Sequence, residues 1–367
     1  MRVLLASPIG LSGGIARWTG HILDYYEEKV NKDSCHMDFL SMTLDYHRDM
    51  RNKGLLHRMK KSFVGYYNIA QQEKKILQES RCDVIHIASS ASISLTKDLY
   101  MIHIAHRRGV KAIIHFHFGR IPELARQKNW EWKLLCKVVK KADMVVVIDK
   151  MSYNTLLQAG FTNVRLLPNP IAPKVLEIVG CGEELTRKNR EILFVGHGYR
   201  TKGIYELVAA CRDIAHIKVK MLGAISDATR DDLLKYSGNA EWLDIVGEIP
   251  YEKVIEAMLK CDVFVLPTYT EGFPNVILES MACGCAIVTT PVGAIPEMLE
   301  EEDGKHYGIM VEPRNVEQLK EGIEKMLSDA EFKNECRENV KQRVNERYNM
   351  DSVWRQMVNI WNETAAQ

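Results

Sequence analysis

Twelve short apolar segments alternate with longer amphipathic or polar stretches, and this alternation limits the fold of the 367-residue chain more than any other feature. Apolar runs of four or five residues predict buried strands, and the stretches between them are long enough for helices. Strands and helices that alternate along a chain form parallel sheets with helices on both faces. The strand-like segments fall into two sets of six: Val3–Ala6, Met37–Leu40, Val84–Ile87, Ala112–Phe116, Met144–Ile148 and Val164–Leu167, then Ile192–Val195, Val219–Leu222, Leu243–Val246, Val263–Leu266, Ala286–Thr289 and Gly308–Val311. We therefore predict an α/β protein with two doubly wound parallel-sheet domains.

The boundary between the two sets is marked by Leu167-Pro-Asn-Pro170, where two prolines interrupt the chain. The length also exceeds what one ordinary core requires. We expect the first domain to cover residues 1–169 and the second to cover 170–348.

Composition and cysteine usage limit the cellular compartment. Hydrophobic residues make up 46% and charged residues 26% of the chain, which is typical of a soluble globular protein. No apolar run approaches the roughly 18 residues that span a bilayer. The sequence Met-Arg-Val-Leu-Leu-Ala leads directly into the first strand, so we expect no signal peptide. The nine cysteines contain no CxxC pair, which favours reduced thiols and a cytoplasmic protein.

Charge is divided unequally between the two halves. Residues 1–170 carry 26 Lys and Arg against 15 Asp and Glu, a net charge of +11, whereas residues 171–367 carry 23 against 33, a net charge of −10. The first half therefore either binds an anionic partner or is attracted to the acidic half. Its segment Arg48–Tyr67 interleaves cations with apolar residues, which fits a helix on an anionic membrane surface or an ordinary helix with solvated lysines. Nucleic acid is not expected, because no binding module accompanies the basic residues.

One stretch carries the chemistry of a nucleotide-binding site: Glu271-Gly-Phe-Pro-Asn-Val-Ile-Leu-Glu279, between two predicted strands. We expect a helix that is capped by Asn275 and stops at Gly284. The helix start at Phe273, Pro274, Asn275 and Val276 then presents unpaired amides, which attract phosphate. Glu271 is placed to accept hydrogen bonds from sugar hydroxyls, and Glu279 from a vicinal diol such as a ribose.

Two further motifs follow predicted strands, where ligands of open parallel sheets bind. The loop after the first strand contains Gly13 and Gly14, which let backbone approach a ligand closely. Its spacing is not Gly-x-Gly-x-x-Gly, so a nicotinamide enzyme is disfavoured. After the fourth strand, His115 and His117 share one face and Phe116 and Phe118 the other. A metal site there would lack a nearby Asp, Glu or Cys ligand.

These motifs together resemble the signature of the retaining glycosyltransferases of family four, also called glycosyl transferases group one. The matching positions are Pro267, Glu271-Gly-Phe-Pro274, Glu279, Met281-Ala282, Gly284, Gly293 and Pro296-Glu297. The resemblance implies the GT-B fold, in which two such domains face a cleft and the last helix crosses back to the first domain. Residues 349–367 would then join the first domain, with Trp354 and Trp361 as anchors.

The resemblance also implies roles for individual residues. The stretch Val195-Gly196-His-Gly-Tyr-Arg200-Thr-Lys202-Gly203 is similar to the family's Val-Gly-Arg…Lys-Gly, whose Arg and Lys hold the donor diphosphate. Lys202 matches the lysine, but His197 stands at the arginine position, so either His197 or Arg200 takes over that role. The family histidine after the fourth strand corresponds better to His117 than to His115. Glu271 and His117 are thus the expected catalytic residues.

The implied function is the transfer of a hexose-type sugar, with retention, from a nucleoside-diphosphate donor (a UDP- or GDP-sugar) to a hydroxyl of a saccharide or lipid-linked acceptor. Cell-surface polysaccharide synthesis and a peripheral position at the inner face of the membrane would fit this function. No Asp-x-Asp pair occurs in the chain, so no catalytic metal and no cofactor are expected. Two alternatives stay open: a sugar-nucleotide epimerase or hydrolase, and a non-catalytic sugar-nucleotide-binding module.

Overall fold

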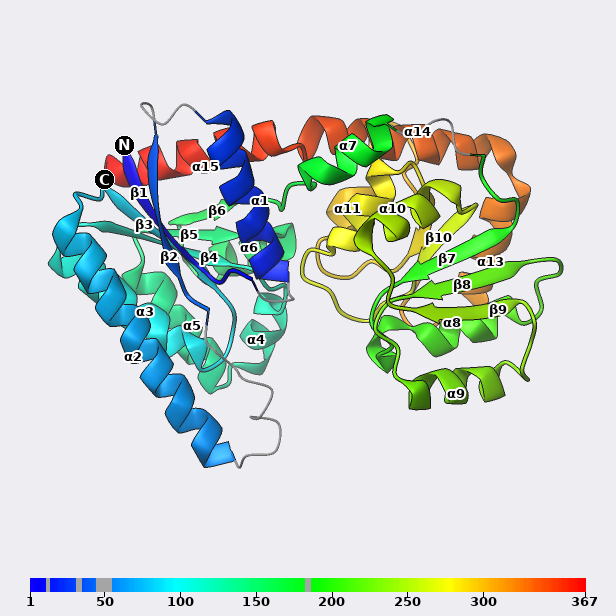
Figure 1. The fold of residues 1–367 in the computed structure, drawn as a ribbon, viewed down its shortest axis with the longest axis horizontal. Coiled ribbons are helices and arrows are strands. Elements are labelled where there is room, and N and C mark those ends of the chain that lie inside the picture. Colours follow the sequence, from blue (N-terminus) through cyan, green and yellow to red (C-terminus); the bar gives the residue numbers. More distant parts are fainter. Residues whose placement is uncertain (11–13, 31–34, 44–54, 182–185) are drawn as a thin grey trace. The chain divides into compact units, whose positions relative to one another are not determined.

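The computed structural model describes residues 1–367 except 11–13, 31–34, 44–54 and 182–185, and except the side chains of 55–63 and 181. The chain forms two compact units, Met1–Asn169 with Val353–Gln367, and Pro170–Ser352. Each unit contains one six-stranded sheet whose neighbouring strands are all parallel, with helices packed around it (Figure 1). The prediction of two doubly wound α/β sheets is confirmed, and all twelve predicted strands are present.

In the N-terminal unit the strand order is β2-β1-β3-β4-β5-β6. The strands are β1 (Arg2–Ser7), β2 (His36–Ser41), β3 (Val84–Ser89), β4 (Lys111–Phe116), β5 (Met144–Val147) and β6 (Val164–Leu166). The helices are α1 (Gly14–Lys29), α2 (Leu55–Glu79), α3 (Ser94–Arg107), α4 (Ile121–Gln127), α5 (Trp130–Lys141) and α6 (Lys150–Gln158). Because the chain goes outward from β1 to β2 and then returns to β3, the strand order reverses between β1 and β3.

The last helix, α15 (Met350–Ala365), belongs mainly to the N-terminal unit. The Trp354 ring packs against Tyr25, with 5.5 Å between ring centroids. Trp361 is fully buried, and its indole Nε1 donates a hydrogen bond of 2.9 Å to Nδ1 of His86 in β3. The prediction that these two tryptophans anchor the helix on the first domain is confirmed.

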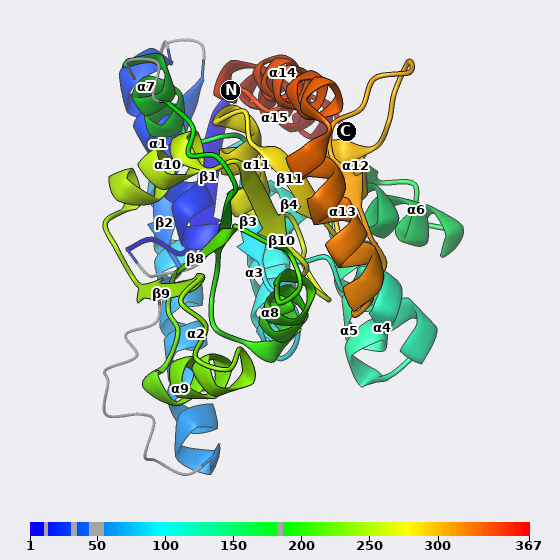
Figure 2. The same ribbon diagram turned by 90° about the vertical axis from the view of Figure 1, so that its right-hand side faces the viewer.

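In the C-terminal unit the strand order is β12-β11-β10-β7-β8-β9. The strands are β7 (Glu191–Val195), β8 (Lys218–Leu222), β9 (Leu243–Gly247), β10 (Val263–Leu266), β11 (Ala286–Thr289) and β12 (Ile309–Met310). The helices are α7 (Pro173–Cys181), the 3-10 turn η2 (Arg200–Lys202), α8 (Ile204–Cys211), α9 (Asp227–Tyr236), α10 (Tyr251–Lys260), α11 (Asn275–Ala282), α12 (Ile295–Leu299), α13 (Val316–Ser328) and α14 (Ala330–Arg347). Helix α13 packs on β10, β11 and α8, and α14 packs on α11 (Figure 2). The order reverses between β7 and β10, which places the expected ligand site at the carboxyl ends of these two strands.

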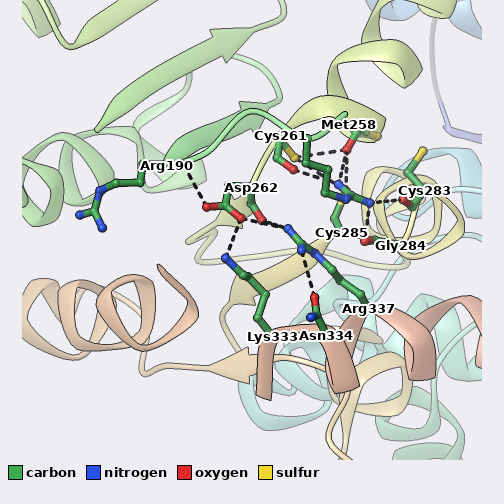
Figure 3. A network of polar contacts seen from close by, with 11 residues as sticks. Arg190, Met258, Cys261, Asp262, Cys283, Gly284, Cys285, Lys333, Asn334 and Arg337 are labelled. Carbon is green, nitrogen blue, oxygen red and sulfur yellow. Dashed lines mark hydrogen bonds and ion pairs between the residues drawn. The ribbon is translucent and has the colours of Figure 1, made fainter. Parts of the chain in front are cut away.

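A buried polar network lies at the amino ends of strands β7 and β10, opposite the carboxyl ends where the ligand site is expected (Figure 3). Asp262, just before β10, accepts hydrogen bonds from Lys333 at 2.8 Å and Arg337 at 3.0 Å, both in α14, and from the backbone amide of Arg190 at 3.0 Å. Arg187 donates to the carbonyl oxygens of Cys261, Cys283 and Gly284, among others. These charges tie α14 and the start of β10 together, away from the edge where the site lies.

Among the helices in the described part of the chain, none combines the length and the apolar character needed to cross a membrane. The eight cysteines that the structure describes, all except Cys181, are free thiols.

Candidate functional site

Two side chains with opposite charge meet beyond the carboxyl ends of β7 and β10. Lys202 ends η2, which follows β7, and Glu271 lies in the loop after β10. The Lys202 Nζ lies 2.5 Å from Glu271 Oε1, and the exposed fractions of the two side chains are 21% and 12%. Their partial burial fixes the ammonium group while leaving it accessible, at the strand-order reversal where an anionic ligand is expected.

Glycines allow the loops around this ion pair to approach closely. Gly203 has a φ of +71°, and a Cβ there would lie 2.0 Å from the carbonyl oxygen of Pro267. Gly293 has a φ of +58°, and a Cβ there would lie 2.5 Å from the backbone oxygen of Glu271. The amide of Ala294 donates to the Gly272 carbonyl at 2.8 Å. Both glycines are therefore required by backbone conformation and by contact.

The helix after the Glu271 loop begins one residue earlier than expected. The N-cap is Pro274, with φ −76° and ψ 106°, and it offers no side-chain cap; Asn275 is the first helical residue. The prediction of Asn275 as the cap is therefore wrong: the extended Pro274, whose φ is set by its ring, ends the loop before Asn275 can do so. Within the described residues, the amides of Phe273, Asn275 and Val276 donate no hydrogen bond to a protein acceptor. The positive end of α11 is thus left for a ligand.

Glu279 lies in the second turn of α11 and is only 7% exposed. The hydroxyl of Tyr251, the first residue of α10, donates to Glu279 Oε1 at 2.8 Å. This bond orients a carboxylate that sequence reasoning identified without its partner. The segment Val246–Tyr251 resembles the family's segment near the nucleobase, but its pairing with Glu279 was not predicted, because the two residues lie 28 positions apart.

Arg200 and His197, the two candidates for the family's diphosphate-binding arginine, precede Lys202 in the sequence. Arg200 is exposed, and its guanidinium carbon lies 4.9 Å from the centre of the Tyr205 ring. His197 is exposed and stacks on Tyr199, with 5.4 Å between centroids and 4° between planes. Gly196 closes β7, where its amide donates to Leu222 and its carbonyl approaches Gly223 too closely for any side chain there. Arg200 carries the permanent charge and shares the η2 turn with Lys202.

In the N-terminal unit, three histidines and Trp18 form a cluster at β3, β4 and α1, in which His86, His115 and Trp18 are buried and His117 is half-buried. His86 Nε2 lies 3.1 Å from His115 Nδ1, and the rings of His115 and His117 lie 3.9 Å apart. Burial lowers the pKa of His86 and of His117 to about 3, and burial together with the neighbouring histidines lowers the pKa of His115 well below its usual value. All three rings are therefore neutral at physiological pH.

The predicted site residues thus divide between the two units. Lys202, Glu271, Phe273, Pro274, Asn275, Val276 and Glu279 lie in the C-terminal unit with Gly196, His197 and Arg200, and His117 lies in the N-terminal unit with Gly14. Gly14 is the first residue of α1, and Gly13 lies outside the described residues. In the parts of the chain that the structure describes, no group of three or more His, Cys, Asp or Glu residues is arranged to hold a metal ion.

Two protein-family models match the chain and together cover most of both units. The model for "Glycosyltransferase Family 4" matches residues 43–175, and the model for "Glycosyl transferases group 1" matches residues 182–343. The chain belongs to this glycosyltransferase family.

Curated relatives of this family member carry glycosyltransferase names. An uncharacterised glycosyltransferase of Methanocaldococcus jannaschii is 27% identical over 58% of the chain. The capsular polysaccharide biosynthesis glycosyltransferase CapM of Staphylococcus aureus is 27% identical over 65% of the chain. An N-acetylgalactosamine-N,N'-diacetylbacillosaminyl-diphospho-undecaprenol 4-alpha-N-acetylgalactosaminyltransferase of Campylobacter jejuni is 28% identical over 58%. The chain spans 56%, 60% and 58% of these relatives' own lengths, respectively.

Solved structures share the fold over the full length of this chain. Sucrose-phosphate synthase from Thermosynechococcus elongatus gives a TM-score of 0.75 at 18% identity, covering 100% of this chain and 99% of that one. HepE from Anabaena in complex with UDP gives a TM-score of 0.71 at 15% identity, covering 99% and 100%. The fold is therefore that of GT-B glycosyltransferases.

Proposed function

We propose that this protein is a retaining glycosyltransferase that moves a hexose-type sugar from a nucleoside-diphosphate donor to a hydroxyl of a saccharide or lipid-linked acceptor in polysaccharide biosynthesis. The observation that carries the proposal is the accessible Lys202–Glu271 pair at the strand-order reversal of the C-terminal unit, beside the uncapped start of α11. A lysine and a helix N-terminus bind a diphosphate, and the carboxylates of Glu271 and Glu279 accept hydrogen bonds from sugar and ribose hydroxyls.

The proposed roles of the residues follow from the negative charge that develops on the leaving group. Departure of the diphosphate creates negative charge, which Lys202, Arg200 and the amides of Phe273, Asn275 and Val276 would stabilise. Glu271 would orient the donor sugar, and His117 would contact a sugar hydroxyl near the reacting carbon. Retention by a front-face route, in which the departing phosphate oxygen takes the acceptor proton, needs no second carboxylate as general base.

The names of the relatives support the class of donor and acceptor. HepE is described in complex with UDP and with UDP-glucose, which favours a UDP-sugar donor. The Campylobacter jejuni name contains a diphospho-undecaprenol-linked saccharide, and CapM is named for capsular polysaccharide. From these two names we infer that the acceptor of this protein is a lipid-linked saccharide.

The assignment of the two carboxylates gives the first test. Glu279→Ala should weaken binding of free UDP by about tenfold or more, because it removes charge-assisted hydrogen bonds to the ribose. Glu271→Ala should leave UDP binding unchanged or make it tighter, since it frees Lys202 from its ion pair, but should abolish most sugar transfer. Isothermal titration with UDP and a transfer assay measure the two effects. Equal weakening of UDP binding by both substitutions would show that the carboxylate roles are wrongly assigned.

We also propose that the N-terminal unit binds anionic membrane. Residues 1–170 carry 26 Lys and Arg against 15 Asp and Glu. The side chains of the basic segment 48–63 all lie outside the described part of the chain, but α2 continues with the exposed apolar residues Val64 and Tyr67, which are 53% and 60% exposed. A few basic residues suffice for reversible binding at about 1 kcal/mol each.

Sedimentation with phosphatidylglycerol or phosphatidylcholine vesicles at low and high salt measures this binding. We expect the protein to sediment only with the anionic vesicles and to be released by salt. The double substitution Val64→Ser and Tyr67→Ser should reduce sedimentation, whereas Tyr236→Ser, which alters an exposed tyrosine of the C-terminal unit, should not. A protein that stays in the supernatant with every vesicle would leave only attraction between basic and acidic halves as the role of the charge.

A further inference from the structure

Three buried aromatic side chains of the N-terminal unit form a chain of two hydrogen bonds. Trp361 Nε1 in α15 lies 2.9 Å from His86 Nδ1 in β3, and His86 Nε2 lies 3.1 Å from His115 Nδ1 in β4. Each of the three side chains is 0% exposed. A residue near the end of the chain is thus linked through the sheet to a histidine beside His117.

The direction of this chain follows from hydrogen-bond chemistry. An indole N–H can only donate, so His86 Nδ1 must carry a lone pair. Because burial keeps the His86 ring neutral, its one proton is on Nε2, which donates to His115 Nδ1. His115 is neutral as well, so its own proton is on Nε2. Trp361 therefore determines the tautomer of both histidines.

Where this series of hydrogen bonds ends at His115, three polar atoms lack a partner among the residues that the structure describes. Within the described residues, His115 Nε2, His117 Nε2 and Trp18 Nε1 are buried and make no hydrogen bond. The centroid of the Trp18 ring lies 5.2 Å from that of His115 and 4.6 Å from that of His117, so the three side chains belong to one cluster. Buried polar groups are nearly always paired in native proteins, which points to a ligand group here.

The chemistry of the three atoms limits that group. Trp18 Nε1 and His115 Nε2 are both donors, so the group must offer an acceptor oxygen. A hydroxyl can accept two hydrogen bonds and donate one, so it can accept from both donors and, where the proton of His117 is on Nδ1, donate to His117 Nε2. Neutral rings favour such a hydroxyl over a phosphate or carboxylate, which would be buried without a countercharge.

We propose that Trp361 and His86 are positioning residues that hold His115 as an Nε2–H donor to a sugar hydroxyl bound beside Trp18 and His117. The sugar as ligand rests on the proposed function, whereas the arrangement of protons does not. His115 then acts together with His117. Helix α15 supports the site because Trp361 sets the tautomers of His86 and His115.

The proton arrangement is tested without substrate, by long-range 1H–15N correlation spectra of histidine-labelled protein, with assignments from single histidine substitutions. We expect His86 and His115 each to show one Nε2–H tautomer. Trp361→Phe keeps a ring but loses the donor, so both histidines should shift toward mixed tautomers. The matched control is Trp130→Phe, which removes an exposed indole N–H of the same unit, and it should leave both signals unchanged. An Nδ1–H form of His115 in the unaltered protein, or equal spectra for Trp361→Phe and the unaltered protein, would overturn the proposal.

The link to the sugar is tested by rescue. A glutamine at position 86 can accept from Trp361 and donate to His115, whereas a leucine can do neither. With UDP-glucose and GDP-mannose as donors, His86→Leu should lower kcat about five- to tenfold at unchanged KM for the donor, and His86→Gln should restore most of it. Equal losses in the two variants would reduce His86 to a packing role. If the unaltered protein transfers no sugar at all, the proposed function fails with the hydroxyl ligand, and the spectra still decide the tautomers.

Discussion

Replacing Lys202 by alanine is expected to lower the rate of sugar transfer by about two to three orders of magnitude, the usual cost of removing a preorganised group that stabilises developing charge. Lys202 Nζ is held 2.5 Å from Glu271 at the carboxyl end of β7. Since the chain has no Asp-x-Asp pair to place a metal ion on the diphosphate, we expect the positive charge there to come from side chains and helix amides.

Initial rates with saturating donor measure this effect. The matched control is Lys253→Ala, which removes an exposed lysine of the same unit that is paired with Glu256, and it should change the rate less than twofold. Arg200→Ala and His197→Ala in the same assay decide which of the two residues takes the missing arginine role; the larger loss is expected for Arg200. A Lys202→Ala enzyme that retains more than about a tenth of the rate would contradict the role of this lysine.

The same reasoning gives the expected response to chelator. The unaltered enzyme should keep its rate in excess EDTA, because no step of the proposed mechanism uses a metal ion. Activity that is lost in EDTA and restored by Mn²⁺ would contradict the metal-free donor site and would return His115 and His117 to consideration as ligands.

Local sequence patterns were sufficient to predict the fold. The twelve strands are short apolar runs separated by helices, and this pattern can be read from the sequence without any knowledge of long-range contacts. The candidate donor-site residues were proposed from segments that follow predicted strands and from the family resemblance, and their roles stay predictions. The pairing of Lys202 with Glu271 could not be derived in this way, because it depends on β7 lying next to β10, which only the order of strands in the sheet determines.

The parts that were missed depend on contacts between residues far apart in sequence. Trp361 and His86 are separated by 275 positions, and neither the helix nor the strand alone indicates that the two side chains share a hydrogen bond. Tyr251 and Glu279 are likewise joined by the packing of α10 against α11. The error at Asn275 has a local cause: Asn is a common cap, but the preceding proline already supplies the extended residue that starts the helix.

The second large effect is expected for stability. Asp262→Ala should lower the free energy of unfolding by about 3–5 kcal/mol, the usual cost of removing one partner from a buried ion pair. Asp262 is 4% exposed, and its loss would leave Lys333 and Arg337, with exposed fractions of 12% and 14%, as unpaired buried cations (Figure 3). Urea denaturation of the full chain measures the loss. Hydrogen exchange should locate it in β10 and α14 rather than in β3 of the other unit.

The pH dependence of this effect has a definite sign. Burial raises the pKa of Asp262, but hydrogen bonds from Lys333 and from the Arg190 amide outweigh it, so that the pKa lies below its ordinary value. A carboxylate with a lowered pKa contributes its full stabilisation above the unfolded pKa of about 3.9, and loses it as the pH falls through the folded pKa. The difference in stability between the unaltered protein and Asp262→Asn should therefore be constant from pH 8 to 5 and should shrink below about pH 4. Glu252→Gln, which removes an exposed partner of Lys174, should show little difference at neutral pH. A difference for Asp262→Asn that grows on acidification would mean that the carboxyl is protonated in the native state, and that the network in α14 is held by something other than its charge.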